Sequence, residues 1–246
     1  MRARLFQLAN QLFENCYPLY HILYRTWKAF ADRQERILIK KFIEPGMVIV
    51  DVGANIGVYT RYFSSLTGMT GCVHAFEPSP TNFERLRNNV GHLANVVLTS
   101  AAVGTRSGTI RLYKSDELNV DHRTYDSGEG RQWIDVPVRS LDDYFPAGNR
   151  VDFIKIDVQG FELSVLRGAE RILRDNFDIK ILMEYWPYGL EKALVSPHEL
   201  IAYIESFGFE IVTMPGESYD VGNFKSSAAA DRAEFRNLIL FRTPPA

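Results

Sequence analysis

The residues with the clearest chemical potential lie at 48–60, where the sequence reads V-I-V-D-V-G-A-N-I-G-V-Y-T. A β-branched run ends at Asp51. The turn that follows contains Gly53, Asn55 and Gly57, and apolar residues then resume at helical spacing. This order is typical of a buried parallel strand that leads through a tight turn into a helix. The glycines let a ligand approach the backbone, and the first N–H groups of the helix are free to bind it.

The polar groups of this turn separate two kinds of nucleotide cofactor. Turns that bind a pyrophosphate usually follow G-x-G-x-x-G, in which the anion faces glycine N–H groups. This chain has D-x-G-x-N-x-G instead. A carboxylate and an amide suit a cofactor that offers hydroxyls and an ammonium group, so the pattern predicts S-adenosylmethionine. We expect Asp51, Gly53, Asn55 and Gly57 to bind it.

The ends of the next two predicted strands carry groups that suit the rest of such a cofactor. Glu77 ends V-H-A-F-E-P, 20 residues beyond Gly57, where a carboxylate can accept hydrogen bonds from both ribose hydroxyls. Ser100 and Ala101 open a run of small residues on which an adenine ring could lie flat. A single acidic residue after a strand is often only a helix cap. The set as a whole favours a cofactor site.

The fourth predicted strand ends in F-I-K-I-D-V-Q-G-F-E at 153–162. We expect Asp157 to lie beside the reactive end of the cofactor, where it would hold the methionine ammonium group or orient the acceptor. Glu162 is a second candidate catalytic residue. In the alternative interpretation Asp157 caps a turn and Glu162 complements a helix dipole. Lys155 is expected on a solvated or edge face.

A polar loop at 119–131, N-V-D-H-R-T-Y-D-S-G-E-G-R, supplies candidates for the acceptor side. His122 is the best candidate for a general base, because imidazole transfers protons near neutral pH. Asp121 would orient it, and Arg123 would hold a polar or anionic group of the acceptor. Glu184, at the end of another strand, could also face the acceptor. The alternative is a solvated loop with ordinary mixed charges.

Strands and helices must alternate to position these groups. We expect main-sheet strands at 47–51, 72–77, 96–99, 151–156, 179–184, 210–213 and 237–242, and helices at 58–66, 80–90, 163–175 and 198–207. We also expect 109–113 and 133–138 to pair with each other. This alternation predicts an α/β fold with helices on both faces of a doubly wound sheet. In such sheets ligands bind beyond the carboxyl ends of the strands.

The ordered motifs resemble the FkbM family of S-adenosylmethionine-dependent methyltransferases over residues 44–189. The segments that carry the resemblance are D-V-G-A-N-I-G-V-Y-T (51–60), F-E-P (76–78), A-A-V-G (101–104), D-H-R (121–123), V-R-S-L-D-D-Y (138–144) and I-K-I-D-V-Q-G-F-E (154–162). The resemblance implies a Rossmann-like class I methyltransferase fold, with a seven-stranded, mostly parallel sheet whose last strand is antiparallel. It also implies O-methyl transfer to a hydroxyl of a sugar, glycan or secondary metabolite.

The resemblance assigns roles by position. Asp51 to Gly57 match the family's cofactor loop, Glu77 matches its ribose-binding acid, and Asp157 with Glu162 match its motif after the fourth strand. The family commonly has D-V-E-G where this chain has Gln159. Related small-molecule methyltransferases use magnesium, and Asp157, Glu162 and Glu184 could supply oxygen ligands. No spacing here demands a metal, so none is predicted and a metal site is kept as the alternative.

Length and composition set the remaining expectations. The 246 residues suffice for one α/β domain, which we place at 45–246, and the net charge of −2 gives no reason to expect nucleic-acid binding. Two distant cysteines read as free thiols, and no run of about 18 apolar residues suggests a membrane span, so a cytoplasmic protein is expected.

Residues 1–44 are expected to form an aromatic-rich helical extension, either a packed cap or a surface for peripheral membrane contact, a lid or a homodimer.

Two other functions are consistent with a nucleotide-binding fold. A nucleotide-dependent dehydrogenase or epimerase would bind a nicotinamide cofactor and would need a catalytic Tyr-x-x-x-Lys pair or an equivalent beside it. A non-catalytic cofactor-binding module is the other alternative, although the intact loop and acids argue against loss of activity.

Overall fold

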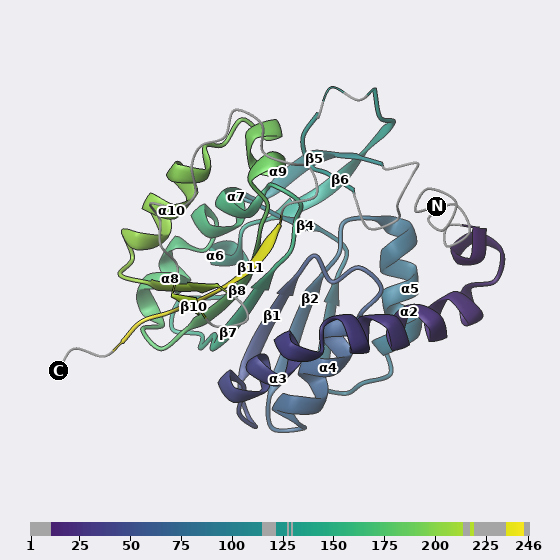
Figure 1. Cartoon of the computed structure of the whole chain (residues 1–246), viewed down its shortest axis with the longest axis horizontal. Helices are drawn as coiled ribbons and strands as arrows, with labels where there is room; N and C mark the ends of the chain where they lie inside the picture. Colours follow the sequence, from purple (N-terminus) through teal and green to yellow (C-terminus); the bar gives the residue numbers. More distant parts are fainter. Residues whose placement is uncertain are drawn as a thin grey trace.

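The computed structural model describes residues 11–114, 122–126, 128, 130–213, 217–218 and 235–243, which form a large sheet flanked by helices and a small second sheet (Figure 1). The strands of the large sheet are β1 (Val48–Val52), β2 (Cys72–Phe76), β3 (Val96–Thr99), β7 (Phe153–Ile156), β8 (Lys180–Tyr185), β9 (Glu210–Thr213), β10 (Glu217–Ser218) and β11 (Arg236–Phe241). The small sheet contains β4 (Ala102–Val103), β5 (Gly108–Tyr113) and β6 (Trp133–Arg139).

The large sheet has the order β10-β9-β11-β8-β7-β1-β2-β3. Strands β1, β2, β3, β7 and β8 pair in parallel, and β11 runs antiparallel to both β8 and β9. The seven expected strands are therefore confirmed, including the antiparallel last one, and the two-residue β10 adds an eighth among the described residues. Strands β2 and β3 follow β1 toward one edge of the sheet, whereas β8 follows β7 toward the other edge. The switch point, where ligands bind in such sheets, lies between β1 and β7.

The described helices are α2 (Tyr17–Ala31), α3 (Arg33–Phe42), α4 (Val58–Thr67), α5 (Pro80–Val90), α6 (Leu141–Tyr144), α7 (Glu162–Arg167), α8 (Glu170–Asp175), α9 (Pro187–Lys192) and α10 (Pro197–Glu205). None of them is long and apolar enough to cross a membrane. The helix expected at 163–175 is interrupted, which corrects the prediction. A side chain at Gly168 would lie 2.0 Å from the Gly104 carbonyl oxygen, so close packing fixes the chain at this break.

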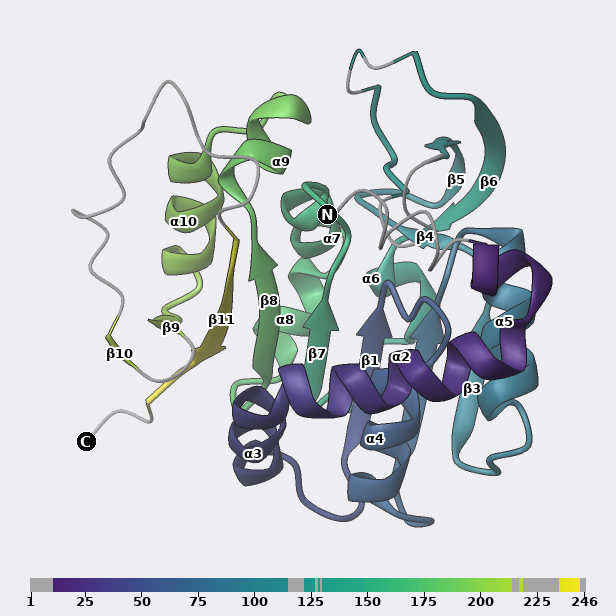
Figure 2. The ribbon, with the colours of Figure 1, turned by 45° about the vertical axis from the view of Figure 1, so that its right-hand side comes forward.

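Consecutive residues of the central strands belong to different cores, as a sheet covered on both faces requires. Ile49 packs in one apolar cluster with residues of α3 and α4, whereas its neighbour Val50 packs in another with residues of α7, α8 and α10. The paired strands expected at 109–113 and 133–138 are confirmed as the antiparallel pair β5–β6. Figure 2 shows this pair beyond the carboxyl ends of the large sheet's strands.

Candidate functional site

The turn from β1 to α4 is shaped by packing against its neighbours. Gly53 has a φ of 79°, and a side chain there would lie 2.0 Å from the Asp157 carbonyl oxygen. Gly57 has a φ of 87°, and a side chain there would lie 2.7 Å from Leu86 of α5. Both glycines thus let the turn pack against the loop after β7 and against α5. Their predicted role in letting a ligand approach the turn stays a prediction.

Glu77 connects the end of β2 to this turn. One carboxyl oxygen accepts a hydrogen bond from the Asn55 N–H and the other from the Ser79 N–H, both at 2.9 Å. Burial raises the pKa of Glu77 to about 7, although these two N–H groups favour the ionised form. Each oxygen keeps a further lone pair. The carboxyl group can therefore accept two hydroxyl donors without losing its contacts to the turn.

A buried ion pair connects β1 to β7. The Lys155 ammonium lies 3.2 Å from the Asp157 carboxylate and 3.7 Å from that of Asp51. The other oxygen of Asp51 accepts a hydrogen bond from Thr60 at 2.7 Å. Lys155 is only 5% exposed, so the expected solvated or edge position is wrong. A strand with parallel neighbours on both sides has no solvated edge for a lysine, and its ammonium group is stabilised by the two acids instead.

The charges of this group are set by mutual contacts. Burial alone would lower the pKa of Lys155, but Asp157 and Asp51 outweigh it and raise that pKa. Burial likewise opposes ionisation of Asp157, but Lys155, Lys28 and the Gln159 amide outweigh it and lower the Asp157 pKa. Burial raises the pKa of Asp51. The Lys155–Asp157 pair is therefore the stably charged part of the site.

Gln159 joins Asp157 to Glu184. Its side-chain amide donates to a carboxyl oxygen of Asp157 at 3.1 Å and to one of Glu184 at 2.6 Å, so it connects the loop after β7 to β8. Burial, followed by the charge of Asp157, raises the pKa of Glu184 well above its usual range. A glutamate in place of Gln159 would add a third carboxyl group and remove both amide donors.

Glu162 begins α7 and turns back toward the loop. One carboxyl oxygen accepts from the Gly160 N–H at 3.0 Å, while the other is buried with no hydrogen-bond partner among the described residues. Burial raises the pKa of Glu162 to about 7. After burial, the charge of Asp157 contributes to the raised pKa of each of four carboxyl groups: Asp51, Glu77, Glu162 and Glu184. The structure thus brings the predicted acids together at one end of the sheet.

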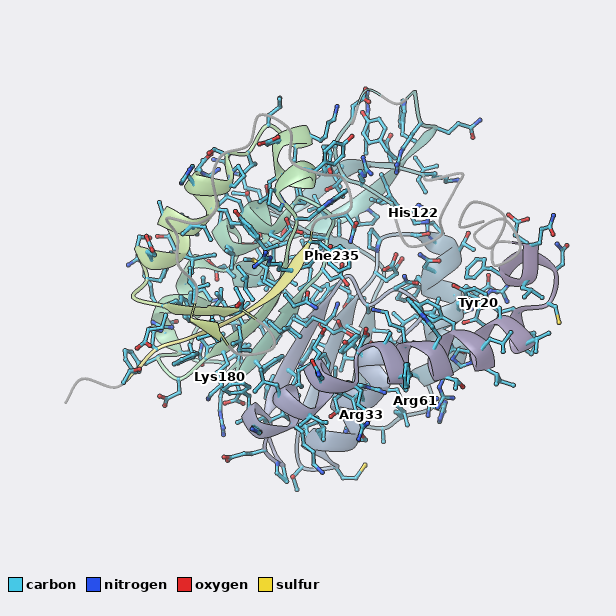
Figure 3. All side chains as sticks on the ribbon, viewed as in Figure 1. Tyr20, Arg33, Arg61, His122, Lys180 and Phe235 are labelled. Carbon is cyan, nitrogen blue, oxygen red and sulfur yellow. The ribbon has the colours of Figure 1, made fainter. Side chains whose placement is uncertain are left out.

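The polar loop reaches the same end of the sheet. Arg123 exchanges backbone hydrogen bonds with Tyr113 of β5, and its buried guanidinium lies 5.2 Å from the ring centroid of Trp186, which follows β8. Tyr125 donates a hydrogen bond to the Gln159 carbonyl at 2.7 Å. His122 is half-buried at this end of the molecule (Figure 3). Asp121 lies outside the described residues.

The remaining candidates follow β3. Ala101 is buried and Ser100 is exposed, and the role predicted for them, contact with an adenine ring, stays a prediction. Within the described part of the chain no three His, Cys, Asp or Glu side chains are arranged to hold a metal ion.

Sequence reasoning missed several residues near the site, among them Tyr24 and Lys28 of α2. The acid that raises the Tyr24 pKa most, after burial, is Asp157. Lys28 and Lys155 both lie against the ring of Tyr59. Contacts between segments this far apart in the chain leave no local sequence signal. The burial of Lys155 did have a local signal in the sequence, because its strand is apolar on both sides of the lysine.

Known proteins match part of the chain. The 2-O-methyltransferase NoeI of Sinorhizobium fredii is 31% identical over 156 residues, which are 56% of this chain and 63% of NoeI. The hexuronic acid methyltransferase AglP of Haloferax volcanii is 29% identical over 161 residues, 62% of this chain and 64% of AglP. The chain thus spans less than two thirds of the length of either relative.

A solved structure of Aeropyrum pernix fibrillarin with S-adenosyl-L-methionine matches with a TM-score of 0.49 at 16% identity, covering 85% of this chain and 74% of the other. The model of the family described as "Methyltransferase FkbM domain" matches residues 51–211, and the chain belongs to that family.

Proposed function

We propose that the protein is an S-adenosylmethionine-dependent O-methyltransferase that acts on a hydroxyl of a sugar, glycan or small metabolite. The observation that carries the proposal is the group of five carboxyl side chains at the switch point of the sheet, two of which share the ammonium group of Lys155. The five are Asp51, Glu77, Asp157, Glu162 and Glu184.

The electrostatics of this group favour a cationic ligand. Buried carboxyl groups that share one site resist ionisation, as the raised pKa values of Glu77 and Glu162 indicate. A ligand with a sulfonium and an ammonium group would supply the missing positive charge. A dinucleotide with a pyrophosphate would add negative charge and would be repelled. The same observation therefore supports S-adenosylmethionine over NAD and weighs against the dehydrogenase alternative.

The residues present fit the parts of this cofactor. Glu77 has lone pairs for both ribose hydroxyls, and Ser100 and Ala101 follow the neighbouring strand, where the adenine would lie. Asp157 is held ionised by Lys155, so it can bind the cofactor's ammonium group. When bound, the cofactor supplies an electrophilic methyl group on a sulfonium. The protein then has to align the acceptor oxygen and remove its proton.

We propose two side chains as candidates for the general base that removes the proton from the acceptor hydroxyl. Glu184 is one candidate, because burial and the charge of Asp157 raise its pKa and so make it a stronger base than an ordinary carboxylate. His122, in the loop that docks on the same end of the sheet, is the other candidate. Arg123 lies buried against Trp186, so we propose that it positions the loop that faces the acceptor.

The choice of a sugar hydroxyl as acceptor is supported by the relatives, because NoeI is described as a 2-O-methyltransferase and AglP as a hexuronic acid methyltransferase. A transfer assay with methyl-labelled cofactor against sugars, uronic acids and hydroxylated metabolites tests the proposal. Label transfer to one acceptor class, lost in a Glu77→Ala variant, is expected. Cofactor binding without turnover on any acceptor would instead favour the non-catalytic module.

The division at residues 44/45 stays a prediction, as do a cytoplasmic location and peripheral membrane or homodimer contact through the N-terminal helices. The outward side of α2 supports such a contact, since several large apolar side chains on it are exposed: Leu19, Ile22, Leu23, Trp27 and Phe30.

A further inference from the structure

Helix α2 is fixed at its first turn to the cofactor turn and to α5. The Asn89 side-chain amide donates to the Tyr17 hydroxyl at 2.7 Å and to the carbonyl of Ile56, within the turn after β1, at 2.8 Å. The guanidinium of Arg85 lies 4.1 Å from the centroid of the Tyr17 ring. One asparagine thus ties the start of α2 to the loop that is proposed to bind the cofactor.

The other end of α2 is fixed beside the buried ion pair. Lys28 pairs with Asp32 at 3.0 Å, and Asp32 accepts a hydrogen bond from the Tyr59 hydroxyl, also at 3.0 Å. The Lys28 ammonium lies 5.7 Å from the centroid of the Tyr59 ring, and the Lys155 ammonium lies 5.3 Å from the same centroid. A single aromatic ring therefore contacts both cations, and Lys28 lies next to the charged group at the switch point.

The middle of α2 spans the distance between these two attachments. Figure 2 shows the helix crossing in front of β7 and β1 toward α5. Tyr24 stacks on Tyr20, which Figure 3 labels, with ring centroids 5.4 Å apart. The Tyr24 side chain is half-buried, and no described residue forms a hydrogen bond with its hydroxyl. Burial and then the charge of Asp157 raise the pKa of Tyr24, and its side chain lies with that of Lys28 on the half-buried side of α2.

We propose that α2 forms one wall of the cofactor site, and that Lys28 and the Tyr24 hydroxyl bind the carboxylate of the cofactor's amino-acid end while Asp157 binds its ammonium group. The inference rests on the proposed function. An amino-acid group carries both charges a few ångströms apart and therefore needs a cation as well as an anion from the protein. Lys155 is already shared by two acids, whereas among the described residues Lys28 forms an ion pair with Asp32.

These two residues are a feature of this chain outside the family domain, whose match begins at residue 51. The orientation of α2 agrees with the proposal, because its apolar side chains such as Leu23 and Phe30 are exposed while Tyr24 and Lys28 are turned inward. The helix thus presents its polar side to the cluster of acids.

Calorimetric binding of two ligands tests the proposal. S-adenosylhomocysteine keeps the amino-acid end of the cofactor, and 5′-methylthioadenosine lacks it. For Lys28→Met we expect about tenfold or weaker binding of S-adenosylhomocysteine, the loss typical of one charged hydrogen bond, and unchanged binding of 5′-methylthioadenosine. Tyr24→Phe should cause a smaller loss with the same selectivity. Lys28→Arg should keep most of the affinity.

Lys40→Met is the matched control, since Lys40 is exposed on α3, and it should bind both ligands like the wild type. Equal weakening of both ligands by Lys28→Met would overturn the proposal, because α2 would then only support the fold. So would unchanged affinity for S-adenosylhomocysteine. If the wild type itself binds no S-adenosylhomocysteine, the proposed function fails, and that result is distinct from any difference among the variants.

Discussion

Removing the buried ammonium group of Lys155 should destabilise the protein strongly. The group lies 3.2 Å from Asp157 and 3.7 Å from Asp51. Asp157 is partly exposed and water can replace its lost partner. Asp51 is fully buried, and among the described side chains it would keep the hydrogen bond from Thr60. Breaking a buried ion pair from one side costs about 3–5 kcal/mol, and the exposure of Asp157 places Lys155→Met near the lower end, at about 3 kcal/mol. That is a large part of a domain's usual stability of roughly 5–15 kcal/mol.

The loss should depend on pH with a defined sign. Burial already raises the pKa of Asp51, and removal of Lys155 raises it further in the folded state. A carboxyl group with a raised folded-state pKa costs no stability while it is protonated in both states, and the cost appears as pH rises through its folded pKa. The Lys155→Met penalty should therefore be smaller at about pH 5 than at about pH 8.

Urea unfolding of the wild type and the variant at several pH values measures this penalty. The double variant Asp51→Asn with Lys155→Met should recover part of the stability at high pH, because it removes the stranded charge. Lys40→Met, which alters an exposed lysine, should leave stability unchanged within about 0.5 kcal/mol. A Lys155→Met variant that loses less than about 1 kcal/mol at every pH would refute the account of the buried pair.

Three further predictions concern neighbouring groups. Burial raises the pKa of Glu162 to about 7, so its contribution to stability is present below the ordinary carboxyl pKa and is lost as pH rises through about 7. In urea unfolding at acidic and alkaline pH, Glu162→Gln should remove up to about 3 kcal/mol of the wild type's loss of stability. An identical loss in both proteins would exclude Glu162 as its source. His122→Ala should lower turnover in steady-state kinetics, while its cofactor affinity, measured by calorimetry, should stay near that of the wild type. Normal turnover would exclude His122 as the general base. Gln159→Glu should cost about 2 kcal/mol or more near neutral pH, with recovery in acid, because two amide hydrogen bonds are replaced by a third acid. Equal unfolding curves at both pH values would contradict the bridging role of Gln159.

The sheet topology was predictable because alternating apolar strands and helices constrain it through local periodicity and handed connections. The convergence of Glu77, Asp157 and Glu184 was predictable for a related reason, since carboxyl ends of parallel strands share one edge of the sheet.

The apolar residues on both sides of Lys155 were a signal of its burial, but its contact with Asp51 had none, because that contact joins separate strands. The packing that requires a glycine at position 53 was also not predicted, since the Asp157 carbonyl that it accommodates lies more than a hundred residues further along the chain. The position of Tyr24 depends on where α2 crosses the sheet, and that is set by contacts of Tyr17 and Lys28 with distant helices. Such contacts have no signature in the sequence of either partner alone.

Calorimetric titration with S-adenosylhomocysteine measures whether the acids at the switch point bind an adenosyl cofactor. We expect saturable binding to the wild type, no binding of NAD, and an affinity lower by about 1–3 kcal/mol in Glu77→Ala. Binding of NAD without S-adenosylhomocysteine, or an unchanged affinity in Glu77→Ala, would contradict this expectation.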